Sequence, residues 1–445
     1  AASLLWAVCP CKLMLNSLVF SEPLYTCLIL LFVLMLMQLH RGISGDKKEW
    51  WMCIVEGSLL GFLLQCINIV RPIAGILIIA LFLIFIYGTA LAGFVMKDRE
   101  FSQMENRTLM QMPELTLADI WSGKFMEDYE TYITDQFVAR DFFVGMKSLG
   151  EKLLGKKINN GVYFAKDGYL IEQFTVADDT LPMRNALAIG KFAKNIDAKV
   201  AVALIPGSVE INRDKLYTDI PDESQKDIID KIYTSLRAEE VQCVDMLGGL
   251  SEHKKESIFY HTDHHWTSLG AYYGYKEVAK TLGLHAVELD MYQETKRSDS
   301  FYGTLYSKAG AFWLKPDEII TYVEDDTIKV TQMEGATEKD GFLYDLQKLE
   351  EKDKYAMFLG GNQPLVKIEA KDKEGKLLII RDSYSDSLAP FLTAHYGEIY
   401  LWDFRYNKES VSGFIKEKGI DNVLICYSVD NFCEDTNISF VLGRE

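Results

Sequence analysis

The chain is poor in basic residues for its length. Its 445 residues include 47 Lys and Arg but 64 Asp and Glu, which leaves a formal net charge of −17. Proteins bind nucleic acids largely through Lys and Arg side chains that neutralise phosphates. We therefore expect no nucleic-acid partner.

Proline is also scarce, at 10 residues, whereas 49% of all residues are hydrophobic. Disordered and collagen-like chains have the opposite composition. At roughly 150 residues per domain, the length suggests about three structural units. The composition therefore predicts packed, folded units.

The cysteines do not form a pattern typical of a metal site or a disulfide framework. Five of the 8 lie before residue 67, which leaves Cys243, Cys426 and Cys433, an odd number without a CxxC spacing. Such a set predicts neither a disulfide framework nor a zinc site. Cys243 and Cys426 lie in apolar, strand-like runs and are expected to be buried. We expect no metal and no cofactor.

The charges divide the chain into two parts. Residues 1–96 hold five basic and four acidic side chains, so the acidic excess lies almost entirely after Met96. Ile73–Met96 contains no charged residue and is long enough to cross a hydrocarbon core. Leu24–Leu39 and Trp51–Val70 are shorter or interrupted but still typical of membrane spans. Residues 1–96 are therefore predicted to form transmembrane helices, and a cleaved signal peptide is not expected.

Part of this membrane region carries short motifs of its own. Ser21-Glu22-Pro23 begins one apolar run, and a helix-like run with Gly57 and Gly61 ends in Arg71-Pro72. These motifs resemble the middle of a multi-spanning, mannosyltransferase-type glycosyltransferase over about residues 1–75. The loop that carries the catalytic acids of that family is absent here, so the resemblance implies an inactive fragment. Plain anchor helices are the alternative.

Residues 97–155 are predicted to form a helical stalk. Apolar residues recur at helical spacing over Leu117–Phe125 and Tyr129–Leu154. A β-hairpin should follow, because Asn160-Gly161 and Asp167-Gly168 flank short alternating runs.

Strand and helix patterns alternate through the predicted domain 156–445, with a mostly β insertion at about 284–350. This order predicts an α/β fold in which a parallel sheet has helices on both faces. Catalytic groups should lie beyond the carboxyl ends of the strands. The predicted strands are 199–205, 241–245, 355–359, 376–381, 399–402 and 422–426, and the predicted helices are 224–239, 267–282, 411–418 and one from about Ser387.

Three of the chain's 7 histidines lie within one short segment, Phe259–Thr267. They are His261, His264 and His265, beside Asp263. Histidine is a base near neutral pH and a metal ligand, so this density favours a functional site over a buried structural cluster. On an extended segment Asp263 and His265 share one face and His264 points the other way, which favours a structural role for His264.

A second candidate site is Ser383, which follows the buried strand 376–381. A serine between a strand and a helix can be a nucleophile beside anion-binding N–H groups, or simply a helix cap. An Asp-His pair on the same edge of the sheet favours the nucleophile.

These residues together resemble a known family. Asp263-His264-His265-Trp266 and Asp382-Ser383-Tyr384, with the segments FSQMENRTLMQMPEL, DQFVARD and NGVYFAKDGYLI, resemble the bacterial DHHW proteins. Those proteins are related to the SGNH-hydrolase-like domains of alginate O-acetylation proteins, and the resemblance covers about residues 97–445. It implies an SGNH-hydrolase-like fold in which Ser383 is the acyl nucleophile, His265 the general base and Asp263 the residue that orients the imidazole.

The resemblance also implies an oxyanion hole and a substrate site. The Ser383 N–H, the Gly361 N–H and the Asn362 side chain are the expected oxyanion donors, although Gly360-Gly361-Asn362 also suits an ordinary turn. Arg381 stands where the relatives have the Gly of a Gly-Asp-Ser turn. Substrate contacts are expected from Tyr384 and Arg405. Exposed aromatic residues suited to sugar stacking would be Tyr384, Trp313, Trp402 and Tyr406, although aromatic residues are more often buried in the core.

The expected function is a membrane-anchored O-acyltransferase or esterase that acts on cell-envelope polysaccharide. A membrane-bound O-acyltransferase partner would supply the acyl group. The resemblance implies an extracytoplasmic domain at the cell membrane, whereas Arg41, Lys47, Lys48, Lys97 and Arg99 favour the cytoplasm.

Two other functions stay open. The Asp-His-His segment also occurs in metal-dependent phosphoesterases, but those enzymes need further Asp-rich motifs to bridge two ions, and none is present at a suitable spacing. The other alternative is a non-catalytic polysaccharide-binding protein.

Overall fold

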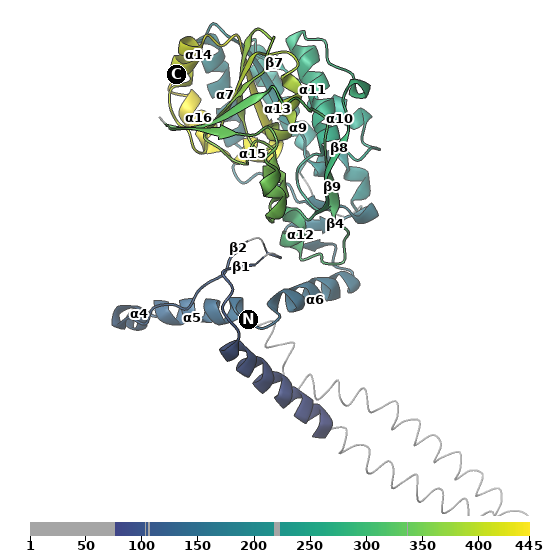
Figure 1. The fold of residues 1–445 in the computed structure, drawn as a ribbon, viewed down its shortest axis with the longest axis vertical. Coiled ribbons are helices and arrows are strands. Elements are labelled where there is room, and N and C mark those ends of the chain that lie inside the picture. The colour runs from purple at the N-terminus through teal and green to yellow at the C-terminus, as the bar shows by residue number, and fades with distance from the viewer. Residues whose placement is uncertain (1–75, 103, 106, 218–222, 336) are drawn as a thin grey trace, which may run out of the picture. The chain divides into compact units, whose positions relative to one another are not determined.

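The computed structural model describes residues 76–445, apart from 103, 106, 218–222 and 336 (Figure 1). The described residues fall into two units. The smaller unit comprises 76–101 and 108–140, and the larger one comprises 102–107 and 141–445. The predicted spans Leu24–Leu39 and Trp51–Val70, and the glycosyltransferase-like motifs in 1–75, lie outside the described residues.

The smaller unit begins with a long apolar helix, Ile76–Val95. Among the described residues it is the one helix whose length and composition suit a membrane span, and it coincides with the predicted span at Ile73–Met96. Two further helices follow, α4 (Leu117–Ser122) and α5 (Lys124–Asp135), separated by Gly123 at φ +82°. The predicted helix from Leu117 to Phe125 is therefore broken at this glycine.

Helix α5 is tied to the segment that follows the apolar helix. The Tyr132 hydroxyl donates to the Asp98 carboxylate at 3.0 Å, and the Gln136 amide donates to the Arg99 carbonyl at 2.9 Å. The segment 97–155, predicted as a stalk, divides between the two units. Its last helix, α6 (Arg140–Leu153), belongs to the larger unit from Asp141 on, and there the Ser148 hydroxyl donates to the Ala309 carbonyl at 2.7 Å.

The predicted hairpin forms the centre of a small antiparallel sheet. Strands β3 (Ile158–Asn159), β4 (Val162–Phe164) and β5 (Leu170–Glu172) pair in sequence order. The predicted turn residues Asn160, Gly161, Asp167 and Gly168 all have positive φ, as tight turns require.

An eight-stranded mixed sheet forms the centre of the larger unit, in the order β11-β10-β12-β14-β13-β15-β6-β7. The five strands from β14 to β7 are parallel, while β12, β10 and β11 extend the sheet in antiparallel pairs. Their bounds are β6 Lys199–Ile205, β7 Gln242–Cys243, β10 Lys329–Glu334, β11 Thr337–Gly341, β12 Leu365–Glu369, β13 Lys376–Arg381, β14 Glu398–Trp402 and β15 Asn422–Ser428.

Helices cover both faces of this sheet, as the alternating pattern predicts. Right-handed crossovers in opposite directions place α9 and α14 on one face and α13 on the other. Helix α7 packs with α9 and α16, and α11 packs with α10 and α13 (Figure 1). The bounds are α7 Leu181–Lys194, α9 Gln225–Ala238, α10 Met246–Glu252, α11 Ser268–Leu282, α13 Ser385–Leu392, α14 Val411–Lys418 and α16 Thr436–Leu442.

The remaining described elements are short. They are β1 Phe101–Ser102, β2 Arg107–Thr108, β8 Thr295–Phe301, β9 Asp317–Thr321, α8 Ser208–Ile211, α12 Thr304–Ala309, α15 Val429–Glu434 and the 3₁₀ helices η1 Lys166–Gly168, η2 Arg213–Lys215, η3 Leu289–Met291, η4 Leu346–Glu350 and η5 Lys354–Met357.

One predicted strand, Tyr355–Leu359, is wrong. These residues form η5 and a turn, because Leu359, Gly360 and Gly361 lie at φ +57°, +76° and +85° and cannot continue an extended chain. The strand that pairs with β14 is β12, which begins at Leu365, six residues after the end of the predicted strand.

The predicted β-rich region at about 284–350 has two parts. Strands β8 and β9 pair with each other, whereas β10 and β11 join the main sheet through β12.

A first prediction concerns the packing of α11. A Cβ atom on Gly274 would lie 2.7 Å from the buried Trp266 ring, whereas a Cβ on Gly150 of α6 would meet nothing within 4 Å. Gly274→Ala should lower the free energy of unfolding by about 1–3 kcal/mol, because the core would be overpacked. The control Gly150→Ala should leave it unchanged or raise it by up to about 1 kcal/mol. Denaturant unfolding of both variants checks this, and equal stabilities would contradict it.

Candidate active site

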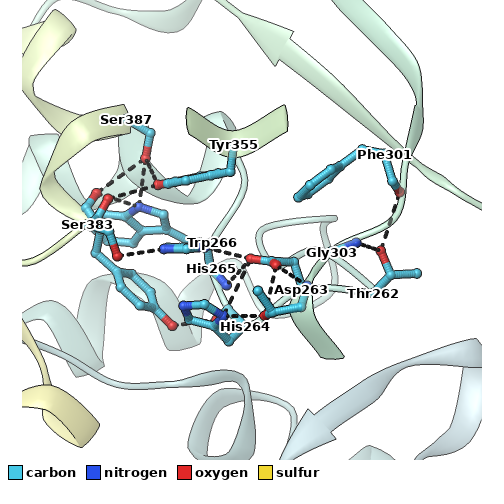
Figure 2. Close-up of polar contacts among 12 residues, drawn as sticks. Thr262, Asp263, His264, His265, Trp266, Phe301, Gly303, Tyr355, Ser383 and Ser387 are labelled. Carbon is cyan, nitrogen blue, oxygen red and sulfur yellow. Dashed lines mark hydrogen bonds and ion pairs between the residues drawn. The ribbon is translucent and has the colours of Figure 1, made fainter. Parts of the chain in front are cut away.

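Residues far apart in the sequence meet at the carboxyl edge of the sheet. Ser383 follows β13, and its Oγ lies 2.8 Å from His265 Nε2, across 118 residues of sequence (Figure 2). His265 Nδ1 lies 2.6 Å from Asp263 Oδ1. The three residues predicted to act together therefore form one continuous hydrogen-bonded chain.

The Asp263 carboxylate is held from several sides. Its Oδ1 also accepts the His265 backbone N–H at 3.0 Å, and its Oδ2 accepts the Thr304 N–H at 2.7 Å and the Thr304 hydroxyl at 3.1 Å. A Cβ on Gly303 would lie 2.2 Å from the Asp263 Cβ, so only glycine permits this approach. These contacts define the position of Asp263 relative to the imidazole.

The His265 ring is packed between other aromatic groups. The Tyr355 ring stacks on it at 3.8 Å with an interplanar angle of 10°, and the His264 ring lies 3.9 Å away. The Tyr355 hydroxyl donates to the Ser383 carbonyl at 3.3 Å. Tyr355 therefore contacts both the imidazole and the serine turn.

Trp266 links the histidine segment to α13. Its ring is fully buried, and its Nε1 donates to the Tyr384 carbonyl at 3.1 Å and to the Ser387 hydroxyl at 2.9 Å (Figure 2). The residue that follows His265 is thereby hydrogen-bonded to the residue that follows Ser383.

Asp382 holds the serine turn from the other side. One carboxylate oxygen accepts the Ser428 N–H, the Ser428 hydroxyl and the Asn431 amide, each at 2.8 Å, and the other accepts the Tyr384 N–H at 3.1 Å. Within the described part of the chain, the Ser383 N–H has no hydrogen-bond acceptor. It is thus available to a ligand.

Arg381, the residue that differs from the expected glycine, points into the core. It is fully buried, and its Nη1 lies 2.8 Å from Asp386 Oδ1 of α13. Burial raises the pKa of Asp386 to about 7. The Arg381 side chain therefore occupies the core rather than the serine turn.

Gly361 and Asn362, the two predicted oxyanion residues on the Gly-Gly-Asn turn, differ in their hydrogen bonds. The Gly361 N–H donates to the Phe358 carbonyl at 3.1 Å, so this donor is engaged within its own turn. The Asn362 Oδ1 accepts Arg405 Nη2 at 3.0 Å, and its amide NH₂ has no acceptor among the described residues. The turn lies beyond the carboxyl end of β14, where Leu365 pairs with Trp402, on the same edge as Ser383. No hydrogen bond among the described residues joins the turn to Ser383.

The residues proposed for substrate contacts are largely buried or paired. Tyr384 is 3% exposed, and its hydroxyl donates to the His264 carbonyl. Trp402 is fully buried, so the expectation of exposed stacking surfaces is wrong for these two residues, because both rings pack into the core. Trp313 is half-buried and Tyr406 is exposed. Arg405 is exposed, and its guanidinium binds the buried Asp403 carboxylate at 2.6 Å.

The surroundings of His265 and Asp263 shift both pKa values. Burial and the neighbouring His264 lower the pKa of His265 below 6.5, against the opposing effect of Asp263. Burial raises the pKa of Asp263, but the imidazoles of His264 and His265 outweigh it and hold the pKa well below its usual range. Around neutral pH the pair is therefore a neutral imidazole beside a carboxylate, the state that a general base needs.

The same cluster offers ligand atoms for a metal ion. Asp263, His264 and His265 provide one atom each within 4.8 Å of one another. However, both ring nitrogens of His265 lie within hydrogen-bond distance of Ser383 or Asp263, and both Asp263 oxygens accept protein donors. These contacts fit a proton-transfer chain better than a metal site.

No sequence pattern predicts several of the residues that hold Asp263 and His265 in place. Gly303 and Thr304 lie 40 and more residues from Asp263, and Tyr355 lies in a segment predicted as a strand. Only tertiary contacts bring them to the site. Trp266 follows His265 directly in the sequence, but only the fold brings it to its hydrogen-bond partners Tyr384 and Ser387.

The profile of the DHHW protein family matches residues 163–402. This chain belongs to the DHHW family. The match includes the Asp263-His264-His265-Trp266 segment from which the resemblance was inferred, and it extends to Trp402 at the end of β14.

Solved structures agree on the fold. A DHHW family protein from Eubacterium siraeum is 24% identical, with a TM-score of 0.54 over 65% of this chain and 96% of that one. PatB1 from Bacillus cereus, solved with a sulfonyl adduct, is 19% identical, with a TM-score of 0.55 over 64% of this chain and 99% of that one. The predicted SGNH-hydrolase-like α/β fold is confirmed.

A curated relative is the probable alginate O-acetylase AlgJ of Pseudomonas fluorescens. It is 24% identical over 174 residues, which are 37% of this chain and 44% of the relative. The matched region spans less than half of that protein.

A second prediction follows from the lowered pKa of His265. A neutral imidazole accepts the serine proton, so ester turnover should be lost only as the pH falls through the lowered pKa of His265. The acid limb of kcat/KM should therefore have its midpoint below pH 6.5. Asp263→Asn should lower the rate by about 10²-fold or more, because the imidazole loses its orienting carboxylate. A pH–rate profile of both proteins checks this, and a midpoint well above 6.5 would contradict the assignment of His265 as base.

Proposed function

We propose that this protein is a polysaccharide O-acyltransferase that works through an acyl-serine at Ser383. The observation that carries the proposal is the hydrogen-bonded chain from Ser383 Oγ to His265 Nε2 and from His265 Nδ1 to Asp263 Oδ1. Such a chain activates a serine for attack on an acyl carbonyl.

In the first half-reaction, Ser383 Oγ attacks the carbonyl carbon of the acyl donor. His265 Nε2 takes the hydroxyl proton, and Asp263 stabilises the imidazolium that forms. His265 then passes the proton to the leaving group as the bond between the donor and the acyl carbon breaks. The result is an ester between the acyl group and Ser383.

In the second half-reaction, a sugar hydroxyl attacks the carbonyl carbon of the acyl-serine. His265 takes the proton of that hydroxyl and returns it to Ser383 Oγ as the serine ester breaks. The sugar leaves as an O-acyl ester and the enzyme is restored. Attack by water in place of the sugar would give simple ester hydrolysis.

The negative oxygen of each tetrahedral intermediate needs hydrogen-bond donors. The Ser383 N–H supports this role because it is unoccupied within the described chain. The Asn362 amide is the second donor we propose, since its turn lies on the same edge of the sheet. Gly361 would first have to release the Phe358 carbonyl, so its N–H is the weaker candidate.

The substrate class is inferred from the relatives and the family. One relative is named as a probable alginate O-acetylase, which supports a cell-envelope polysaccharide as the acceptor here. The apolar helix Ile76–Val95 supports anchoring at the cell membrane. The resemblance to the alginate O-acetylation proteins supports a domain on the extracytoplasmic side. A membrane-bound O-acyltransferase partner would then be the donor of the acyl group.

A third prediction tests the covalent step. A fluorophosphonate probe should label the wild-type chain and fail to label Ser383→Ala, and acetyl-ester turnover should fall by about 10³-fold or more in that variant. Ser251→Ala is the matched control, because Ser251 is exposed on α10 and should label and turn over normally. Intact-protein mass spectrometry after mixing with an acetyl ester should show one added acetyl group on the wild type only.

The same assay separates the alternatives. A metal-dependent phosphoesterase would lose activity with a chelator and would not depend on Ser383. A non-catalytic polysaccharide-binding protein would show neither labelling nor turnover. Equal ester turnover by the wild type and Ser383→Ala would disprove the triad.

A further inference from the structure

A cavity of about 420 Å³ adjoins the proposed triad. Its volume lies within the range of about 300–1,000 Å³ that is usual for small-ligand pockets. Its lining includes His264 and Tyr384, which are the neighbours of His265 and Ser383 in the sequence.

Direct contacts connect the cavity to the triad. The His264 ring lies 3.9 Å from the His265 ring, and the Tyr384 ring lies 4.9 Å from it. Ser428 and Asn431, which also line the cavity, hold the Asp382 carboxylate behind the serine turn. A molecule bound in the cavity would therefore contact the chain neighbours of His265 and Ser383.

Carboxylates dominate the charge of the cavity. Glu172, Asp430 and Glu434 line it, and the basic side chains in the lining are Lys308 and His264. His264 Nδ1 lies 3.7 Å from Asp263 Oδ1. Lys308 is already paired with Glu172, at 2.7 Å. The lining is therefore negative and has no unpaired cation to offer.

Among the lining carboxylates, Asp430 is the one whose pKa is raised. Its Oδ2 accepts the Gln225 amide at 2.8 Å, and no basic residue of the described chain forms an ion pair with it. Burial and the nearby Glu172 raise the pKa of Asp430 to about 6. A further negative charge in the cavity would be repelled, whereas a hydroxyl or ammonium donor would be attracted.

Uncharged polar groups complete the lining. Gln173 and Thr175 have side chains without a hydrogen-bond partner among the described residues, and both face the cavity. Amide and hydroxyl groups of this kind bind sugar hydroxyls. Phe174, which lies between them in the sequence, also lines the cavity and is otherwise buried in the hydrophobic core.

We propose that this cavity binds the acceptor sugar, and that Asp430 and Glu434 select a neutral or amino sugar over a uronic acid. The inference rests on the proposed function, because it assumes that a sugar hydroxyl takes the acyl group from Ser383. It assigns this chain an acceptor different from alginate, which is a polymer of uronic acids.

The test measures binding apart from catalysis. The full-length Ser383→Ala chain, in detergent, is titrated with oligomers of N-acetylglucosamine, glucosamine and mannuronic acid at one ionic strength. We expect the first two to bind at least about tenfold more tightly than the uronate, because like charges exclude a partner. Adding Asp430→Asn and Glu434→Gln should remove most of this preference.

A matched control changes the same type of charge elsewhere. Glu374→Gln, in the Ser383→Ala chain, removes an exposed carboxylate from the connection before β13, at the opposite edge of the sheet. It should keep the full preference. Retained binding of N-acetylglucosamine oligomers by the Asp430 and Glu434 variant shows that its cavity is intact.

The outcomes separate the two proposals. Equal or tighter binding of the uronate, or a preference that survives the loss of both carboxylates, overturns the selectivity whether or not Ser383 is catalytic. Selective binding with wild-type ester turnover that depends on Ser383 supports both proposals. Absence of turnover in the wild type overturns the acyltransferase, and with it the role of the cavity as an acceptor site.

Discussion

The hydrogen bond between His265 and Ser383 is the contact on which the rest of the site depends. It joins a loop before α11 to a turn after β13, and neither segment could position its own partner. A hydrogen bond of this kind is directional and short, so small displacements of either segment break it. Much of the surrounding structure serves to prevent such displacements.

The restraints come from side chains outside the hydrogen-bonded chain of Ser383, His265 and Asp263. Trp266 bonds the histidine segment to α13, Asp382 bonds the serine turn to Ser428 and Asn431, and Tyr355 stacks on the imidazole. The polar groups that make these contacts are largely buried and hydrogen-bonded, and breaking one such contact would cost about 1–3 kcal/mol. The contacts that stabilise the site therefore also hold its side chains in place.

Burial also determines the electrostatics. Removing His265 from water disfavours its charged form, and the Asp263 carboxylate compensates only in part. The imidazole is therefore neutral around neutral pH, as the proposed role of general base requires. In the adjoining cavity burial again disfavours the charged form, and it therefore raises the pKa of the Asp430 carboxylate beside Glu172.

Local patterns in the sequence were sufficient for much of this protein. They predicted the strands β6, β13 and β15, the capped helices α9 and α11 and the apolar helix Ile76–Val95. The resemblance to the DHHW proteins indicated Asp263, His265 and Ser383 as the proposed triad. Apolar periodicity and caps depend on neighbours within a few residues, so they can be recognised in one dimension. The parallel order of the strands then placed Asp263, His265 and Ser383 on one edge.

Only the tertiary structure decided the rest. Strand β12 and the η5 turn, the burial of Tyr384 and Trp402, the engagement of the Gly361 N–H and the support of Asp263 by Gly303 and Thr304 all arise from contacts between distant segments. The same is true of the acidic cavity, whose lining comes from residues 161 to 434. Residue types define which chemistry is available, but the distances and the burial that select one chemistry are set when separate segments pack together.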